Sequence, residues 1–152
     1  VVATPGEWEF ELIELKAPGS IWNPDPNGRL YMAADSEGYE GRRGYVEETS
    51  GAYYAARLGV LEALSERDRQ AKVFVVRHAT NEYWAPVGVW QIRESIRDAV
   101  EGEPVVAESF HGAVSELVPR LPVSMADLRR KSTMVAGIQS DLSAFGAGVG
   151  DP

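Results

Sequence analysis

An α/β (or α+β) fold, as a single domain with one small sheet and packed helices, is the class that the sequence predicts. Three observations indicate it: a short apolar run at 73–76, helical periodicity before it at 53–64, and helical periodicity after it at 89–100. A helix, a strand covered on both faces and another helix, in that order, are typical of an α/β arrangement. We therefore expect a central buried strand at 72–77.

The length and composition suit one globular domain. The chain has 152 residues, 44% of them hydrophobic, which is enough to bury a core. We expect a single α/β domain over 1–138 and a flexible tail over 139–152. No stretch approaches the roughly 20 apolar residues that cross a bilayer, and the first residues lack a signal-peptide pattern, so we expect a cytoplasmic protein without a membrane partner.

The residue types limit the chemistry. There is no cysteine and there are two histidines, so disulfides, thiolate zinc sites and cysteine nucleophiles are excluded and a His-rich metal site is not expected. We predict no metal and no cofactor. The net charge of −8 argues against a broad basic face for nucleic acid, so any contact with DNA is expected to be local.

The basic residues are mostly arginines. Three lysines, Lys16, Lys72 and Lys131, stand beside twelve arginines in a chain with 23 acidic residues. This halophilic composition resembles that of proteins from salt-loving archaea. In molar salt the Debye length is about 3 Å, so attraction between charges farther apart is screened. An ordinary acidic cytosolic protein is the alternative, because excess acid is mainly a statement about solubility.

The first fifty residues predict two strands and two loops. Residues 7–16 alternate apolar and polar and then shift phase, which indicates a strand with one buried face and a bulge. Prolines and glycines make 17–29 a loop, and 30–34 is a short strand. Residues 35–44 are rich in glycine and charge, so we expect them to be exposed.

The rest of the chain predicts several further elements. Thr49 or Ser50 caps the helix that runs to about Glu66. After the central strand and its following helix, we expect a strand at 105–110, a short helix at 111–118, and a helix at 124–137 with Ser124 as its N-cap.

Polar residues at the end of the central strand are candidate site residues. Arg77 and His78 stand at its carboxyl end, where open α/β sheets leave a crevice. Pro86 suits the first turn of the next helix. On that helix Val89, Ile92, Ile96 and Val100 form one apolar stripe, predicted to pack against the sheet.

A second row of the same helix could bind a ligand. Trp90, Arg93 and Arg97 recur at spacings of three and four, and such a row can stack a base or hold a phosphate or carboxylate. Trp84 in the preceding loop and Glu94 complete the candidate nucleic-acid or phosphate site. The alternative is a tryptophan at the edge of the core with both arginines paired to Glu94 and Asp98 on a solvated surface.

The tail contains a short docking pattern. Gln139, Leu142 and Phe145 lie in QSDLSAF, and in one 3₁₀ turn residues three apart share a face. Glutamine, an aliphatic and an aromatic at this spacing match the clamp-binding peptide (a PIP-like motif), although Gly146 stands where a second aromatic is usual. The alternative is the frayed end of a last helix that packs Leu142 and Phe145 on its own domain.

Several segments together resemble the C-terminal region of the archaeal Nre family of DNA-repair proteins. The resemblance extends from SIWNP at 20–24 onward over nearly the whole chain. Its segments are YYAARLGVLEAL at 53–64, the strand ending in Val75-Val76-Arg77, YWAPVGVW at 83–90 with Arg93, Glu94 and Arg97 behind it, and the terminal QSDLSAF.

The resemblance implies a role in the DNA-damage response, with the terminal peptide docking on a sliding clamp of the proliferating-cell-nuclear-antigen type. It also implies a longer N-terminal portion, which would hold a metal site or DNA contacts. His78 follows Arg77 where the family often has Glu, which argues against a catalytic carboxylate at that position.

Three functions follow as hypotheses. The first is a repair factor that docks on a sliding clamp through Gln139, Leu142 and Phe145. The second is a nucleotide- or nucleic-acid-processing enzyme with an Arg/Trp pocket at the end of the strand at 72–77, in which Glu94 or His78 moves a proton. The third is a structural domain that binds its partners elsewhere. The sequence contains no phosphate loop and no nucleophile elbow, so the catalytic residues of the second hypothesis stay unknown.

Overall fold

A four-stranded mixed sheet lies at the centre of the molecule. The computed structural model describes residues 1–83, 85 and 87–137. The strands are β1 (Val2–Pro5), β2 (Glu9–Lys16), β3 (Tyr31–Glu37) and β4 (Ala71–Ala79), in the order β1-β4-β2-β3. β4 pairs in parallel with β2 and antiparallel with β1, and β2 pairs antiparallel with β3. The prediction of an α/β domain with a central strand at 72–77 is confirmed.

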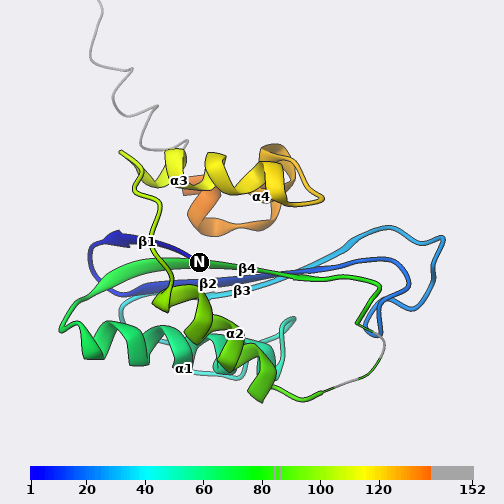
Figure 1. Cartoon of the computed structure of the whole chain (residues 1–152), viewed down its shortest axis with the longest axis horizontal. Coiled ribbons are helices and arrows are strands. Elements are labelled where there is room, and N and C mark those ends of the chain that lie inside the picture. Colours follow the sequence, from blue (N-terminus) through cyan, green and yellow to red (C-terminus); the bar gives the residue numbers. More distant parts are fainter. Residues whose placement is uncertain (84, 86, 138–152) are drawn as a thin grey trace, which may run out of the picture.

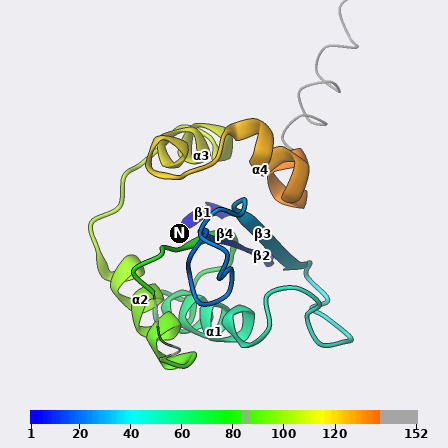
Figure 2. The same ribbon diagram turned by 90° about the vertical axis from the view of Figure 1, so that its right-hand side faces the viewer.

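Helices cover both faces of this sheet (Figures 1 and 2). On one face lie α1 (Gly51–Glu66) and α2 (Trp90–Glu101). On the other face lie α3 (Phe110–Leu117), the 3₁₀ helix η1 (Val118–Arg120) and α4 (Met125–Lys131), followed by a helical stretch at 133–137. The result is a three-layer arrangement with the sheet in the middle.

The strand β2 differs from its prediction. Residues 10–15 are all buried, and β2 pairs residue by residue with β3 and β4 without a bulge. Phe10 and Leu12 face the core beneath α1 and α2, whereas Ile13 and Leu15 face the core beneath α3 and α4. The apparent phase shift in the sequence therefore reflects a strand that is covered on both faces.

The expected exposure of residues 35–44 is wrong at its start. Asp35 and Glu37 are buried in β3. The carboxylate of Glu37 accepts hydrogen bonds from Trp8 Nε1 (2.7 Å), Tyr53 Oη (3.1 Å) and Arg57 Nε (2.7 Å). Burial, reinforced by Glu37, raises the pKa of Tyr53, so this phenol stays protonated and joins α1 to the sheet.

Asp35 holds the segment that enters α1. Its carboxylate accepts hydrogen bonds from the amides of Glu47, Glu48 and Thr49 and from the hydroxyl of Thr49, at 2.7 to 3.0 Å. Ser50 is the N-cap residue, but its side chain caps no amide and its φ is +52°. The predicted side-chain cap by Thr49 or Ser50 is therefore not formed, and Asp35 instead fixes the residues that lead into the helix.

The bounds of other helices and strands also differ from their predictions. α2 begins at Trp90 rather than at Pro86, and residues 105–110 form no strand before α3. Ser124 caps α4 through a capping box with Asp127, as predicted, but α4 ends at Lys131.

The apolar stripe of α2 packs mainly on α1 rather than directly on the sheet. Ile92 and Ile96 are buried and Val100 is partly buried, whereas Val89 is half exposed. Gly59 of α1 lies directly against Ile96, which lets the two helices approach closely. None of the helices in the part of the chain that the structure describes is long and apolar enough to cross a membrane.

Candidate functional site

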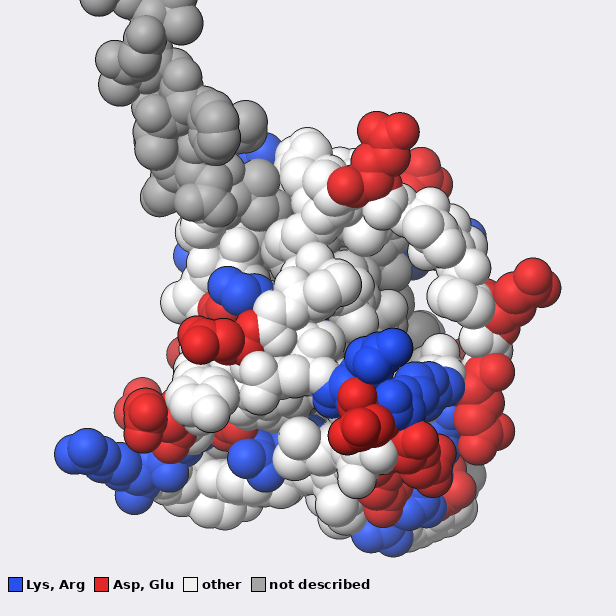
Figure 3. Space-filling model, turned by 90° about the vertical axis from the view of Figure 1, so that its left-hand side faces the viewer, with Lys and Arg blue, Asp and Glu red and all other residues white. Residues whose placement is uncertain are grey.

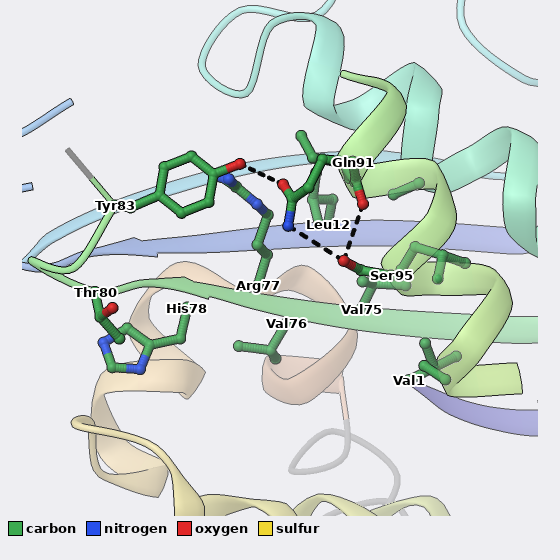
Figure 4. A pocket seen from close by; sticks show the side chains of 14 residues that line it. Val1, Leu12, Val75, Val76, Arg77, His78, Thr80, Tyr83, Gln91 and Ser95 are labelled. Carbon is green, nitrogen blue, oxygen red and sulfur yellow. Dashed lines mark hydrogen bonds between the residues drawn. The ribbon is translucent and has the colours of Figure 1, made fainter. Parts of the chain in front are cut away.

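A pocket of about 300 Å³ lies where the end of β4 meets α2 (Figure 4). Apolar side chains from the sheet and the helices form its floor. Tyr83, Gln91 and Ser95 form a polar chain along one wall: Tyr83 Oη donates to Gln91 Oε1, and Gln91 Nε2 donates to Ser95 Oγ (3.3 Å). The polar wall therefore consists of neutral groups, which suits hydrogen bonding rather than proton transfer.

Arg77 lines this pocket with its guanidinium already paired. Its Nη1 lies 2.6 Å from Oε1 of Glu14, a buried carboxylate on the neighbouring strand. Its guanidinium packs against two aromatic rings that also contact each other: it lies 5.1 Å from the centroid of Trp22 and 5.3 Å from that of Tyr83, and the two centroids are 5.1 Å apart. An arginine that is paired and stacked in this way is held in one position and acts first as a structural support.

His78 points the other way. Successive side chains of a strand face opposite sides of the sheet, and Figure 4 shows Arg77 directed toward Tyr83 and His78 directed away from it. Both residues line parts of the pocket. They do not converge on one point, so an arginine–histidine pair acting on one substrate atom is not formed here.

The predicted row on α2 lies outside the pocket. The pocket is lined by Gln91, Ser95 and their apolar neighbours of α2, and not by Trp90, Arg93, Glu94 or Arg97. Arg97 forms ion pairs with Glu62 of α1, through Nε and Nη2 at 2.9 Å each, and with Glu94. The hydrogen bonds to Glu62 raise the pKa of Arg97, and those from Arg97 lower the pKa of Glu62.

The candidate residues thus divide into separate groups. Arg77 and His78 lie at the pocket, while the α2 row faces α1 and the surface. Trp84 lies outside the described residues, as do Gln139, Leu142 and Phe145. The separation of Arg77 from Arg93 and Arg97 counts against an enzyme that would hold one phosphate with all three.

Among the described residues, no group of three or more His, Asp or Glu side chains could hold a metal ion. On the face shown in Figure 3, basic and acidic side chains lie next to one another rather than in separate patches. That face offers no extended basic surface to a phosphate backbone.

Two aromatic residues that the sequence did not single out lie near the carboxyl ends of β2 and β4. Trp22, in the loop after β2, and Tyr31, the first residue of β3, are 41% and 50% exposed. The motif SIWNP could have indicated that Trp22 is exposed. This tryptophan lies in a loop among prolines and glycines, where no helical or strand periodicity predicts a buried face.

Comparison with known proteins identifies the family. The model of the family described as "Archaeal Nre, C-terminal" matches residues 37–145. The chain is 67% identical over 145 residues to a DNA repair protein NreA of Haloferax volcanii, which covers 95% of this chain and 34% of that protein. It is 40% identical over 115 residues to a DNA repair protein NreA of Archaeoglobus fulgidus, covering 76% of this chain and 28% of that protein.

The same archaeon has a third relative, a DNA repair protein NreB, which is 29% identical over 134 residues. No solved structure matches the chain. The chain spans about a third of the length of the curated relatives that it matches. With the family model covering more than half of its residues, this chain belongs to the archaeal Nre family and corresponds to the C-terminal region of that family.

Proposed function

We propose that this chain is the clamp-docking part of a DNA-damage repair factor, in which Gln139, Leu142 and Phe145 bind a sliding clamp. Membership of a family whose relatives are named DNA repair proteins supports the repair role. The spacing of a glutamine, an aliphatic and an aromatic residue in QSDLSAF supports the docking role.

One structural observation favours docking from this position. Glu11 of β2, a buried carboxylate, accepts hydrogen bonds from Ser132 Oγ (2.5 Å), from the amides of Thr133 (2.8 Å) and Met134 (3.1 Å), and from Thr133 Oγ1 (3.2 Å). The negative charge sits at the amino end of the helical stretch at 133–137, where a carboxylate is favourable. The residues that precede the peptide are therefore anchored to the middle of the sheet.

The anchored segment reaches the surface just before the peptide. Met134 and Val135 are buried, and Ala136 and Gly137 are exposed. Gln139 follows two residues later. A docking peptide attached at such a point tethers the whole domain to its partner, and tethering raises the local concentration of that domain on the clamp.

Titration calorimetry with an archaeal sliding clamp tests the proposal. Short peptides of this kind bind with dissociation constants in the micromolar range, which corresponds to about 8 kcal/mol. We expect saturable binding by the full chain and none by a chain truncated after Ile138 or by the double variant Leu142→Ala, Phe145→Ala.

A matched control changes the same tail without removing the apolar contacts. Ser140→Ala leaves Gln139, Leu142 and Phe145 in place, and we expect it to bind like the unchanged chain. If the double variant binds the clamp as tightly as the unchanged chain, the peptide is not the docking element and this part of the proposal fails.

A further inference from the structure

The end of the sheet where β2 and β4 finish exposes aromatic rings beside basic side chains. Because β2 and β4 are parallel, the loops that follow them, 17–30 and 80–83, lie at the same end of the sheet (Figure 1). Trp22 and Tyr31 are exposed there, and Lys16 and Arg29 lie close to them in the chain and in space. These four residues are called the aromatic edge below.

The loop that carries Trp22 is held by hydrogen bonds rather than left free. The side-chain amide of Asn23 donates to the carbonyl oxygens of Lys16 (3.0 Å) and Arg29 (2.8 Å), which ties the two ends of the loop together. The amide of Ile21 donates to the carbonyl of Tyr83 (3.2 Å). Gly19 has a φ of +80°, a left-handed conformation that favours glycine.

The ring of Trp22 is held as well. It lies 5.1 Å from the ring of Tyr83, and the guanidinium of Arg77 packs against it. Arg77 is itself fixed by Glu14. An exposed aromatic ring that is already fixed loses little conformational entropy when a ligand stacks on it, so its contact area converts efficiently into affinity.

Tyr31 is a second platform on the neighbouring part of the same edge. It is the residue of β3 that pairs with Lys16 of β2, and Lys16 Nζ lies 5.5 Å from its ring centroid. β3 and β4 are separated by one strand, so Tyr31 and Arg77, on which Trp22 packs, lie on strands roughly 10 Å apart, with an offset of two residues along the strands. Both rings therefore lie at one end of the sheet, where one oligonucleotide can reach them.

The charges around the aromatic edge are balanced. Arg29 is exposed and has no ion pair among the residues that the structure describes, and Lys16 is paired with Glu14 at 3.4 Å. Asp25 and Glu82 are exposed carboxylates on the same two loops. Few phosphates can be neutralised here, so a polyanion that binds must be held mainly by its bases.

We infer that the aromatic edge binds single-stranded nucleic acid, with bases stacked on Trp22 and Tyr31 and with Arg29 contacting the backbone. Every base has a π-face, so this mode is tolerant of sequence. The inference rests on the proposed role in DNA repair, and it assigns the single-stranded ligand to residues that adjoin the pocket through Arg77 and Tyr83 and that are not part of the clamp-binding peptide.

The binding mode predicts a weak dependence on salt. A basic surface that neutralises many phosphates loses affinity steeply as salt rises, because binding releases counterions. Base stacking on aromatic rings does not release counterions. We therefore expect a slope that corresponds to about one phosphate contact, and we expect Arg29→Ala to reduce that slope further.

Fluorescence anisotropy with a labelled oligodeoxythymidine of about 12 nucleotides tests the inference. We expect Trp22→Ala and Tyr31→Ala each to weaken binding about tenfold, and Trp22→Phe to retain most of it, because phenylalanine keeps a stacking face. Tyr39→Ala is the matched control. Tyr39 is 61% exposed and follows the opposite end of β3, so its removal should leave the affinity unchanged.

Two results would overturn the inference: unchanged affinity in both Trp22→Ala and Tyr31→Ala, or an equal loss in these variants and in Tyr39→Ala. Trp22 supports Arg77, so circular dichroism of each variant verifies the fold, and Tyr31→Ala tests the edge without disturbing that support. The clamp titration is run on the same variants. Loss of oligonucleotide binding with intact clamp binding separates this inference from the docking proposal, and the tail variants should show the reverse.

Discussion

Ser132 Oγ donates a 2.5 Å hydrogen bond to Glu11 Oε2, although the two residues are 121 positions apart in the chain. The same serine oxygen accepts a hydrogen bond from the amide of Val135 (2.9 Å). Ser132 therefore caps the helical stretch at 133–137 and connects it to a carboxylate in the middle of the sheet. This contact joins the C-terminal end of the described chain to its most central layer.

The first prediction concerns the charge at this contact. Glu11→Gln keeps the size of the side chain but replaces an acceptor of four hydrogen bonds by an amide whose nitrogen can only donate. Two backbone amides compete for the remaining oxygen, and an unmet buried donor costs about 1–3 kcal/mol. We expect the free energy of unfolding in urea to fall by about 2 kcal/mol.

Hydrogen exchange should locate this loss. The amides of Thr133 and Met134 should exchange faster in Glu11→Gln, while amides of β1 should be affected only through the lower global stability. Glu7→Gln is the control, because Glu7 is exposed and a surface substitution changes stability by about 0.5 kcal/mol or less. Equal stability of Glu7→Gln and Glu11→Gln would contradict the anchoring role.

The second prediction concerns acid stability. Burial alone would raise the pKa of Asp35, but hydrogen bonds from the amides of Glu47, Glu48 and Thr49 and from the Thr49 hydroxyl outweigh it and lower that pKa. A pKa that is lower in the folded state means stability that is present above the unfolded value of about 3.9 and lost as the pH falls through the folded value. Asp35→Asn should lack this contribution.

Urea unfolding between pH 7 and about pH 3 measures it. We expect Asp35→Asn to be less stable than the unchanged chain at neutral pH, and the difference to shrink below about pH 4. Asp98→Asn, an exposed aspartate on α2, should follow the unchanged chain throughout. A difference that stays constant over the whole range would mean that the Asp35 charge does not matter.

The helices and strands that could be predicted from the sequence are those marked by a pattern of apolar residues. The run at 73–76 and the helical periodicities placed the central strand and both helices of one layer correctly, because hydrophobic periodicity reports which face is buried. Asp35, Glu37, Glu11 and Glu14 could not be predicted as buried. Their burial depends on donors from Thr49, Tyr53, Ser132 and Arg77, which are distant in sequence, and charge alone indicates exposure.

The candidate site was less predictable than the fold. The position of Arg77 at the end of a central strand indicated a pocket, and one is present there. The row on α2 could not be assigned, because the same spacing suits a ligand or an ion pair; in the structure Arg97 pairs with Glu94 of its own helix and with Glu62 of α1, and the position of Glu62 does not follow from the spacing. The exposure of Trp22 depends on how its loop folds back, which periodicity does not encode.

The third prediction concerns the pair of Glu14 and Arg77. Removing one partner of a buried pair leaves an uncompensated charge, which costs about 3 kcal/mol or more. We expect Glu14→Gln to lower the free energy of unfolding by about this amount. Adding Arg77→Met should restore part of it, because the double variant leaves no unpaired guanidinium beside the rings of Trp22 and Tyr83. Lys16, which also pairs with Glu14 (3.4 Å), loses that partner in both variants, so its contribution cancels in the comparison.

A double-mutant cycle in urea measures the coupling of this pair. Arg77→Lys serves as a second comparison: the ammonium keeps the charge but loses the flat contact with both rings, so it should be less stable than the unchanged chain. If Glu14→Gln with Arg77→Met were no more stable than Glu14→Gln alone, the cost would not come from the unpaired charge.

The last prediction concerns the close approach of α1 and α2. A Cβ added to Gly59 would lie 2.9 Å from the γ-methyl and 3.1 Å from the Cβ of Ile96, and a β-branched side chain cannot move its first carbon without moving α2. Alanine favours a helix over glycine by about 1 kcal/mol, but overpacking costs about 1–3 kcal/mol. We expect Gly59→Ala to be destabilising in thermal or urea unfolding and Gly59→Val to be more so. Gly38→Ala is the control and should be close to neutral, because a Cβ at Gly38 meets no atom within 4 Å. If Gly59→Ala were more stable than the unchanged chain, the two helices would be free to separate.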